Sequence, residues 1–250
     1  MRANLIEKIE SLPKFELKEI QTIEGKRIKD FRAVQEVNGE VVAIVSKDYK
    51  LVQFKEVFLP LALSFNYVDG GVYYFRGKAL LEMWNSEGIG ILAKNSVDKS
   101  TAIHIKYFVR HWVDNKCYEF ILRGFRRIHI GKADRDLRLV MKAIKKVGKI
   151  WEKLLNKLKE KEIDLKEIEE YIKLPKKLRE EIEARIQWKK AKGEVYTYYD
   201  FWIDSIEYYR KKRYKSEIHR TEKIEKVCDA IINILGAEML ELVLTWNANS

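Results

Sequence analysis

The sequence predicts an α+β fold, with an antiparallel, β-rich N-terminal half and a helical C-terminal half packed on it. In the first half, short runs of β-branched and aromatic residues alternate with turn residues such as Asn38-Gly39 and Asp114-Asn115, a pattern typical of hairpin-linked strands. In the second half, apolar residues recur every three or four positions, the spacing of amphipathic helices. With no repeat or linker, we expect one domain over residues 1–250, β-rich over 1–131 and helical over 132–250.

The strands of the first half are expected to begin with a hairpin. Residues 31–37 and 40–45 are predicted strands, and Asn38-Gly39 between them favours the two positive-φ positions of a type I′ turn. A third strand is expected at 49–53, and Asp69-Gly70-Gly71 predicts a turn. Later strands are expected over residues 72–75, 78–84, 90–94, 101–110 and 116–123, the last two joined by Asp114-Asn115.

Helical spacing first occurs at residues 54–65, where Pro60 is expected either to start the helix or to kink it. After residue 131, Asp134 is expected to cap a long helix. Asp164 and Pro175 are each expected to begin a shorter one. A longer helical stretch is predicted over 199–235, with a last short helix after Gly236.

The charge of the chain has two interpretations. Lys and Arg number 49 against 38 Asp and Glu, which leaves a net charge of +11. Such an excess favours a polyanionic partner, nucleic acid first. A Lys- and Glu-rich chain with three prolines is also typical of hyperthermophile proteins, whose surfaces carry ion-pair networks. Both interpretations stay open at this point.

The sequence predicts a soluble, cytoplasmic protein without a membrane or a cofactor. Cys117 and Cys228 lie far apart and form no CxxC pair, so a disulfide framework or a cysteine-rich zinc site is not expected. Charged residues interrupt the N-terminal segment, unlike a signal peptide, and no apolar run reaches the roughly 20 residues that cross a bilayer. The phosphate-binding and dinucleotide glycine motifs are missing.

The first candidate binding site is a basic predicted strand. Its cations are Arg123, Arg126, Arg127 and His129. Residues two apart in a strand share a face about 7 Å apart, so Arg123, Arg127 and His129 line one face, with Phe125 among them. Cations interleaved with an aromatic ring suit a nucleic-acid backbone and a stacked base. The alternative is an exposed sheet face whose cations pair with Glu and Asp of the helices.

Two further basic clusters are candidates: the first extends this site, and the second is a separate candidate. They comprise Lys142, Lys145, Lys146 and Lys149 on the following helix, and Arg210, Lys211, Lys212 and Arg213 after a tyrosine-rich segment. In that segment Tyr199, Trp202, Ile206 and Tyr209 have the spacing of one helical face. We expect these aromatic residues to lie in the core, and stacking on bases is the alternative.

No catalytic residue and no metal site is predicted. The four histidines show neither HxH nor HExxH spacing. Asp134 and Asp136 with His129 form a minor alternative, the carboxylate cluster of a metal-dependent nuclease. Asp134 is better explained as a helix cap than as a metal ligand. We expect a protein that is not an enzyme.

Several short motifs resemble, in the same order, the phage- and plasmid-associated domain-of-unknown-function family numbered 932. They are Val42–Tyr49, Asn95–Ser100, Ile128-His129 with Gly131, and Tyr198–Trp202 with Ile206 and Tyr208. Lys99 stands where the family has glycine, and Cys117 lacks the family's following asparagine. The resemblance covers roughly residues 30–235 and implies a virus or plasmid origin, of an archaeal, thermophilic type. It implies no particular reaction.

These observations together predict a nucleic-acid-binding protein of a mobile genetic element, acting in DNA replication, recombination or packaging through a basic β-face. Single-stranded DNA is preferred over duplex, because aromatics interleave with cations and no helix-turn-helix or zinc finger is present. A homo-oligomer is left open. The alternative is a non-enzymatic protein-interaction or structural module of a mobile element.

Overall fold

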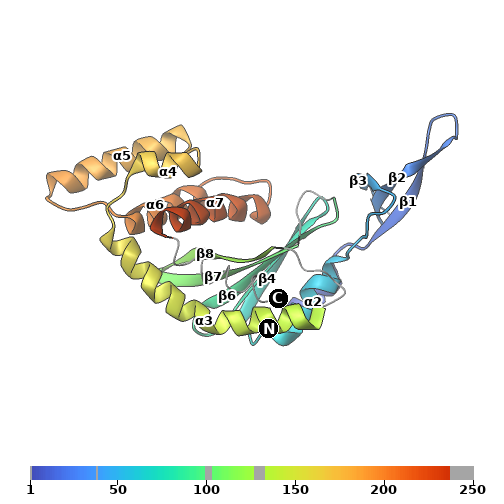
Figure 1. Ribbon diagram of the computed structural model, residues 1–250, viewed down its shortest axis with the longest axis horizontal. Helices are drawn as coiled ribbons and strands as arrows, with labels where there is room; N and C mark the ends of the chain where they lie inside the picture. Colours follow the sequence, from blue (N-terminus) through green and yellow to red (C-terminus); the bar gives the residue numbers. More distant parts are fainter. Residues whose placement is uncertain (1, 38, 99–102, 127–132, 237–250) are drawn as a thin grey trace. The chain divides into compact units, whose positions relative to one another are not determined.

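The computed structural model describes residues 2–37, 39–98, 103–126 and 133–236 (Figure 1). It confirms the α+β class, with antiparallel sheets followed by helices. The chain forms two compact units, a first unit of Met1–Lys106 with Phe125–Ala143 and a second unit of Tyr107–Gly124 with Ile144–Ser250. A single cooperative domain over residues 1–250 stays a prediction, because compactness does not measure cooperativity.

The first unit contains two helices and two sets of antiparallel strands. Its elements are α1 (Arg2–Glu10), β1 (Phe15–Gln21), β2 (Arg27–Glu36), β3 (Val41–Ser46), α2 (Phe54–Ser64), β4 (Asp69–Phe75), β5 (Lys78–Trp84) and β6 (Ile89–Ser96). The strands pair in the orders β1-β2-β3 and β4-β5-β6. Helix α1 packs on α2 and β4, and α2 contacts β5 and β6.

The second unit places helices beside a hairpin. Its elements are β7 (His104–Val113), β8 (Lys116–Arg126), α3 (Ala133–Glu160), α4 (Leu165–Tyr171), α5 (Lys176–Ala191), α6 (Tyr198–Arg210) and α7 (Glu217–Leu235), and the unit boundary falls within β7, β8 and α3. Asp114 and Asn115 join β7 to β8 at φ values of 46° and 62°, which confirms the predicted turn. Helix α6 packs between α5 and α7, and α4 packs on α7 (Figure 1).

Phe54 is the centre of the core of the first unit. Its side chain is 1% exposed, and its ring lies 5.5 Å from the Phe15 ring and 5.9 Å from the Tyr74 ring. Gln53, just before α2, accepts from the backbone N–H of Phe15 (3.1 Å) and donates to its carbonyl (2.8 Å). Helix α2 therefore starts at Phe54, against β1, and Pro60 lies inside it rather than at its start.

The β2–β3 hairpin is confirmed, but the prediction of a type I′ turn was wrong. Asn38 lies outside the described residues. The N–H of Glu36 donates to Glu40 O (3.1 Å), and the N–H of Gly39 donates to Glu36 O (2.9 Å). A bulge between Val34 and Gln35 shifts the register, so the connection is longer than two residues.

One other strand prediction and one turn prediction were also wrong. Residues 49–53 form no strand, because the Gln53 side chain holds this segment to β1. Asp69-Gly70-Gly71 is the beginning of β4, where Gly70 lies opposite Met83. A Cβ on Gly70 would lie 2.5 Å from Glu82 O, so this glycine permits a close backbone approach rather than a turn.

The helices largely follow the prediction. Asp164 caps α4 by accepting from the Lys166 N–H at 2.8 Å. Asp134 lies within α3, which begins at Ala133, and not before it as a cap would. The predicted helix over 199–235 is two helices. Helix α6 ends at Arg210, and α7 begins at Glu217 after its N-cap, Ser216. Elements α1 and β1 were not predicted, and the last short helix lies outside the described residues.

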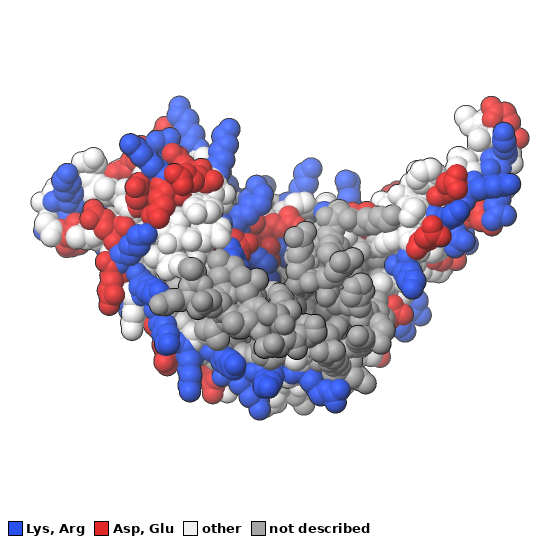
Figure 2. Space-filling model, viewed as in Figure 1, with Lys and Arg blue, Asp and Glu red and all other residues white. Residues whose placement is uncertain are grey.

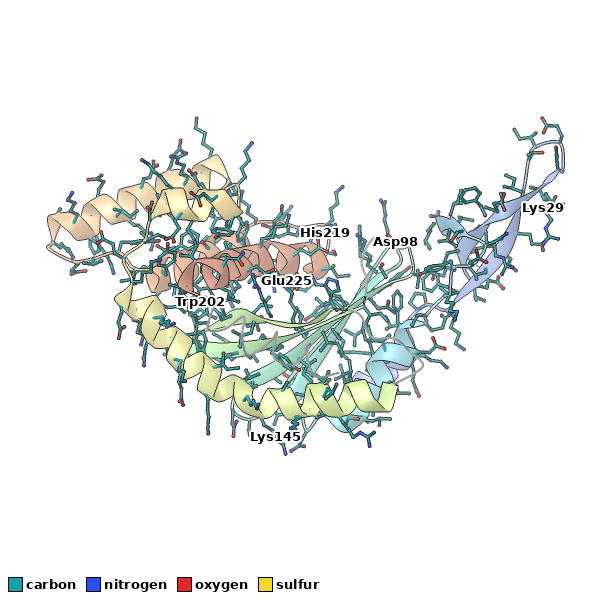
Figure 3. The ribbon with its side chains drawn as sticks, in the orientation of Figure 1. Lys29, Asp98, Lys145, Trp202, His219 and Glu225 are labelled. Atoms are coloured by element: carbon teal, nitrogen blue, oxygen red, sulfur yellow. The ribbon has the colours of Figure 1, made fainter. Side chains whose placement is uncertain are left out.

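The core of the second unit is an aromatic cluster around Trp202, which is fully buried (Figure 3). Its ring lies 5.5 Å from Trp151 of α3 and 5.4 Å from Phe120 of β8, and its indole N–H donates to Glu119 O at 3.4 Å. Trp202 and Tyr209 of the predicted aromatic stripe are thus core residues, as expected, whereas Tyr199 is half-buried. Over the described part of the chain, no helix is long and apolar enough to cross a bilayer.

Candidate functional site

Helix α3 has an apolar face and a basic face on opposite sides. The buried residues of the apolar face are Val140, Ile144, Val147, Trp151, Leu154 and Leu158. The exposed cations of the opposite face, which we call the α3 basic face, are Arg138, Lys142, Lys145, Lys149 and Lys153. At 3.6 residues per turn these five cations lie within an arc of about 80° and extend for about 22 Å.

Lysine and arginine side chains gather along α3 in Figure 2, and Lys145 points outward from the helix in Figure 3. The segment from residue 138 to residue 153 contains six cationic residues and a single carboxylate residue, Glu152. Cations three or four residues apart on a helix repel each other. The surface of α5 differs, because Arg179 pairs with Glu183 at 2.9 Å and Lys176 with Glu180 at 3.8 Å. Ion pairs thus compensate part of the charge of α5.

The predicted basic face of β8 has a different environment from that expected. Arg123 is half-buried, and its guanidinium donates to the Asn233 side chain of α7. This guanidinium therefore bonds to another residue of the fold. The side chains of Arg126, Arg127 and His129 lie outside the described ones.

The predicted cluster Arg210–Arg213 is exposed at the end of α6. Three of its cations contact neighbouring side chains: the Arg210 guanidinium lies 5.2 Å from the Tyr118 ring centroid, Lys212 Nζ lies 4.2 Å from that of Tyr208, and Lys211 Nζ lies 3.8 Å from Glu207. These cations stabilise the carboxyl end of the helix dipole. The cluster is a weaker candidate for phosphate binding than α3.

Glu207 holds the end of α6 to β8. Its carboxylate accepts from the Tyr118 hydroxyl at 2.6 Å and from Lys116 Nζ at 2.9 Å. These two hydrogen bonds lower the pKa of Glu207, because they stabilise its charged form. The carboxylate therefore stays ionised near neutral pH and reduces the net positive charge around Arg210.

His111 lies among aromatic rings of the second unit. Its imidazole is 5.6 Å from the Trp151 ring and 3.1 Å from the Tyr199 hydroxyl. Burial, followed by the charge of Lys159, lowers the pKa of His111, so a neutral packing residue is the natural interpretation. Among the described side chains no group of three or more His, Cys, Asp or Glu could hold a metal ion. The side chains of His129, Asp134 and Asp136 lie outside that set.

Sequence reasoning missed a pocket of about 470 Å³ that is lined by residues of α5 and α6. Its charges compensate each other: Lys189 pairs with Asp200 at 2.8 Å, and Arg185 with Asp204 at 2.5 Å. The Tyr196 hydroxyl also donates to Asp204 at 2.7 Å. Burial raises the pKa of Asp204, while this hydrogen bond and Arg185 oppose that shift. The paired charges leave no excess for an ionic ligand.

Compared with protein-family models, curated proteins and solved structures, the chain matches none of them. The resemblance to family 932 therefore stays a prediction.

Proposed function

We propose that the protein binds nucleic acid through the α3 basic face. The observation that carries this proposal is the local charge of α3, six cations and one carboxylate between residues 138 and 153. The apolar side of the helix is buried, so the cations project toward solvent. A linear polyanion would relieve their mutual repulsion and release its own counterions.

The geometry suits contacts to backbone phosphates. A face about 22 Å long spans roughly six phosphates of one strand at 3.4 Å per nucleotide. Lysine acts here as a flexible point charge, so we expect little sequence preference. Most aromatic residues of α6 are buried, Phe201 and Trp202 among them, and Tyr199 is half-buried. Single-stranded and duplex DNA are therefore both proposed ligands. The proposed setting is the replication, recombination or packaging of a mobile element.

The triple variant Lys142→Gln, Lys145→Gln and Lys149→Gln is expected to weaken binding of every nucleic acid by roughly tenfold or more. The slope of log K against log salt concentration should fall by about 3, since each lost phosphate contact removes close to one counterion. Fluorescence anisotropy of labelled single-stranded and duplex DNA and RNA, at several salt concentrations, measures both quantities.

A matched control removes the same charge elsewhere. Lys55, Lys177 and Lys190 are exposed and lie on α2 and α5. The variant Lys55→Gln, Lys177→Gln and Lys190→Gln should keep the wild-type salt slope to within about 1. Equal losses in the two triple variants would show that net charge, and not α3, is responsible. Salt-insensitive or only millimolar binding by the wild type would contradict the whole proposal.

A protein-interaction module is the second candidate function. The β1-β2-β3 sheet buries one face through Val34 and Val45, and on the other face Phe31 is 50% and Ile44 66% exposed. Apolar side chains clustered on a surface mark interaction sites.

If this face joins two copies, the wild type is expected to be a dimer by light scattering at about 50 µM, a concentration at which micromolar affinity suffices. The double variant Phe31→Ser and Ile44→Ser should then be a monomer. A monomeric wild type would contradict self-association through this sheet.

A further inference from the structure

A second pocket lies between α7, the end of α6 and the segment that joins α4 to α5. Its volume is about 670 Å³, which falls within the roughly 300–1,000 Å³ of small-molecule sites. Among the described residues, four lysines and one aspartate line it, a net charge of +3. These residues are Lys173, Lys212, Lys223, Lys226 and Asp229. The pocket therefore favours an anionic ligand.

Its lysines differ from the cations of the α5–α6 pocket. Within the described part of the chain, Lys173, Lys223 and Lys226 have no carboxylate within the 4 Å of an ion pair. Lys189, in the other pocket, has one at 2.8 Å. Lys173, Lys223 and Lys226 line one pocket, and each ammonium group can donate hydrogen bonds. Phosphate oxygens accept such charge-assisted bonds strongly.

The remaining surface of the pocket provides aromatic rings. Tyr171, Tyr209 and Tyr214 line it, and they range from 49% exposed at Tyr171 to buried at Tyr209. Burial raises the pKa of Tyr209 to about 12, so its hydroxyl stays a neutral donor. Tyrosine rings offer flat apolar surfaces on which a nucleobase can stack. Inorganic phosphate alone would use only the lysines.

We propose that this pocket binds a nucleoside phosphate, with the phosphates among the lysines and the base against the rings of Tyr171 and Tyr214. A free nucleotide and the terminal nucleotide of a strand share this chemistry. The proposal goes beyond the α3 basic face, because its residues come from α6, α7 and the segment before α5.

Isothermal titration calorimetry tests the site with ATP, adenosine and inorganic pyrophosphate as probes. ATP should bind more tightly than either fragment, because only ATP engages both lysines and rings. The double variant Lys223→Gln and Lys226→Gln should weaken ATP binding by roughly 100-fold, about tenfold for each charged hydrogen bond lost. Tyr214→Leu should weaken ATP binding but leave pyrophosphate binding unchanged.

The matched control is Lys177→Gln with Lys190→Gln, two exposed lysines of α5, which should bind ATP like the wild type. Circular dichroism of each variant confirms that it is folded. No heat with millimolar ATP, or equal ATP affinity in the Lys223/Lys226 variant, would overturn the proposal. Pyrophosphate that binds as tightly as ATP, with no effect of Tyr214→Leu, would overturn its nucleoside part.

The source of the nucleotide is separated by competition. Short oligothymidylates with and without a 5′-phosphate are added to the ATP complex. Displacement by the phosphorylated strand alone identifies a strand end, and displacement by neither identifies a free nucleotide. The α3 triple variant should bind ATP like the wild type, so failure of one proposal is distinguishable from failure of the other.

Discussion

Replacement of Trp202 by alanine is expected to lower the free energy of unfolding by about 3–5 kcal/mol, the range for truncation of a large buried aromatic residue. The side chain has no exposed surface and contacts rings of α3 and β8. Its loss leaves a cavity between these elements and a carbonyl, Glu119 O, without its indole donor. Urea denaturation followed by circular dichroism measures the change.

The same substitution at Trp188 is the control, since that side chain is 57% exposed on α5. It forms a cation–π contact with Lys192 at 3.7 Å, so its removal should lower stability by about 1 kcal/mol or less. If Trp202→Ala were as mild as Trp188→Ala, the cluster around Trp202 would not be the core of the second unit.

The parts of the fold that local sequence determines were predictable. The Asp114-Asn115 turn needs two positive φ values, which these residue types tolerate. The buried positions of α3 recur every three or four residues, so its basic face follows from the same periodicity. The α6 aromatic stripe was assigned to the core on the same grounds, and Trp202 confirms it.

Features that depend on distant residues were not predictable in this way. Asn38-Gly39 favours a tight turn locally, but the bulge at Val34 sets a longer connection. Arg123 was predicted to face a ligand, yet its partner Asn233 lies 110 residues further along the chain. The lysine- and tyrosine-lined pocket draws on segments near residues 173, 212 and 226, and no local pattern brings these together.

Replacement of Phe54 by alanine is expected to lower the free energy of unfolding by about 3–5 kcal/mol as well, because it removes the ring at the centre of the first unit. The matched control is Phe31→Ala, because the Phe31 ring is half exposed. This substitution should lower the free energy of unfolding by about 1 kcal/mol or less. Urea denaturation of both variants gives the comparison.

Phe54→Ala also tests the prediction of one domain. The unit boundary falls within β7, β8 and α3, so unfolding one unit must break strands and a helix that continue into the other. We therefore expect a single transition. Trp112, Trp151, Trp188 and Trp202 all belong to the second unit, so tryptophan fluorescence reports mainly on that unit while circular dichroism reports on both.

In Phe54→Ala the two signals should shift together to lower urea concentration, although the mutation lies in the first unit. Trp202→Ala should do the same by circular dichroism. A circular dichroism transition that moves while the fluorescence transition stays in place would instead show two domains that fold independently. The continuous helix α3 would then have to fray at the boundary near Ala143 without unfolding the second unit, an event that hydrogen exchange of the α3 amides would detect.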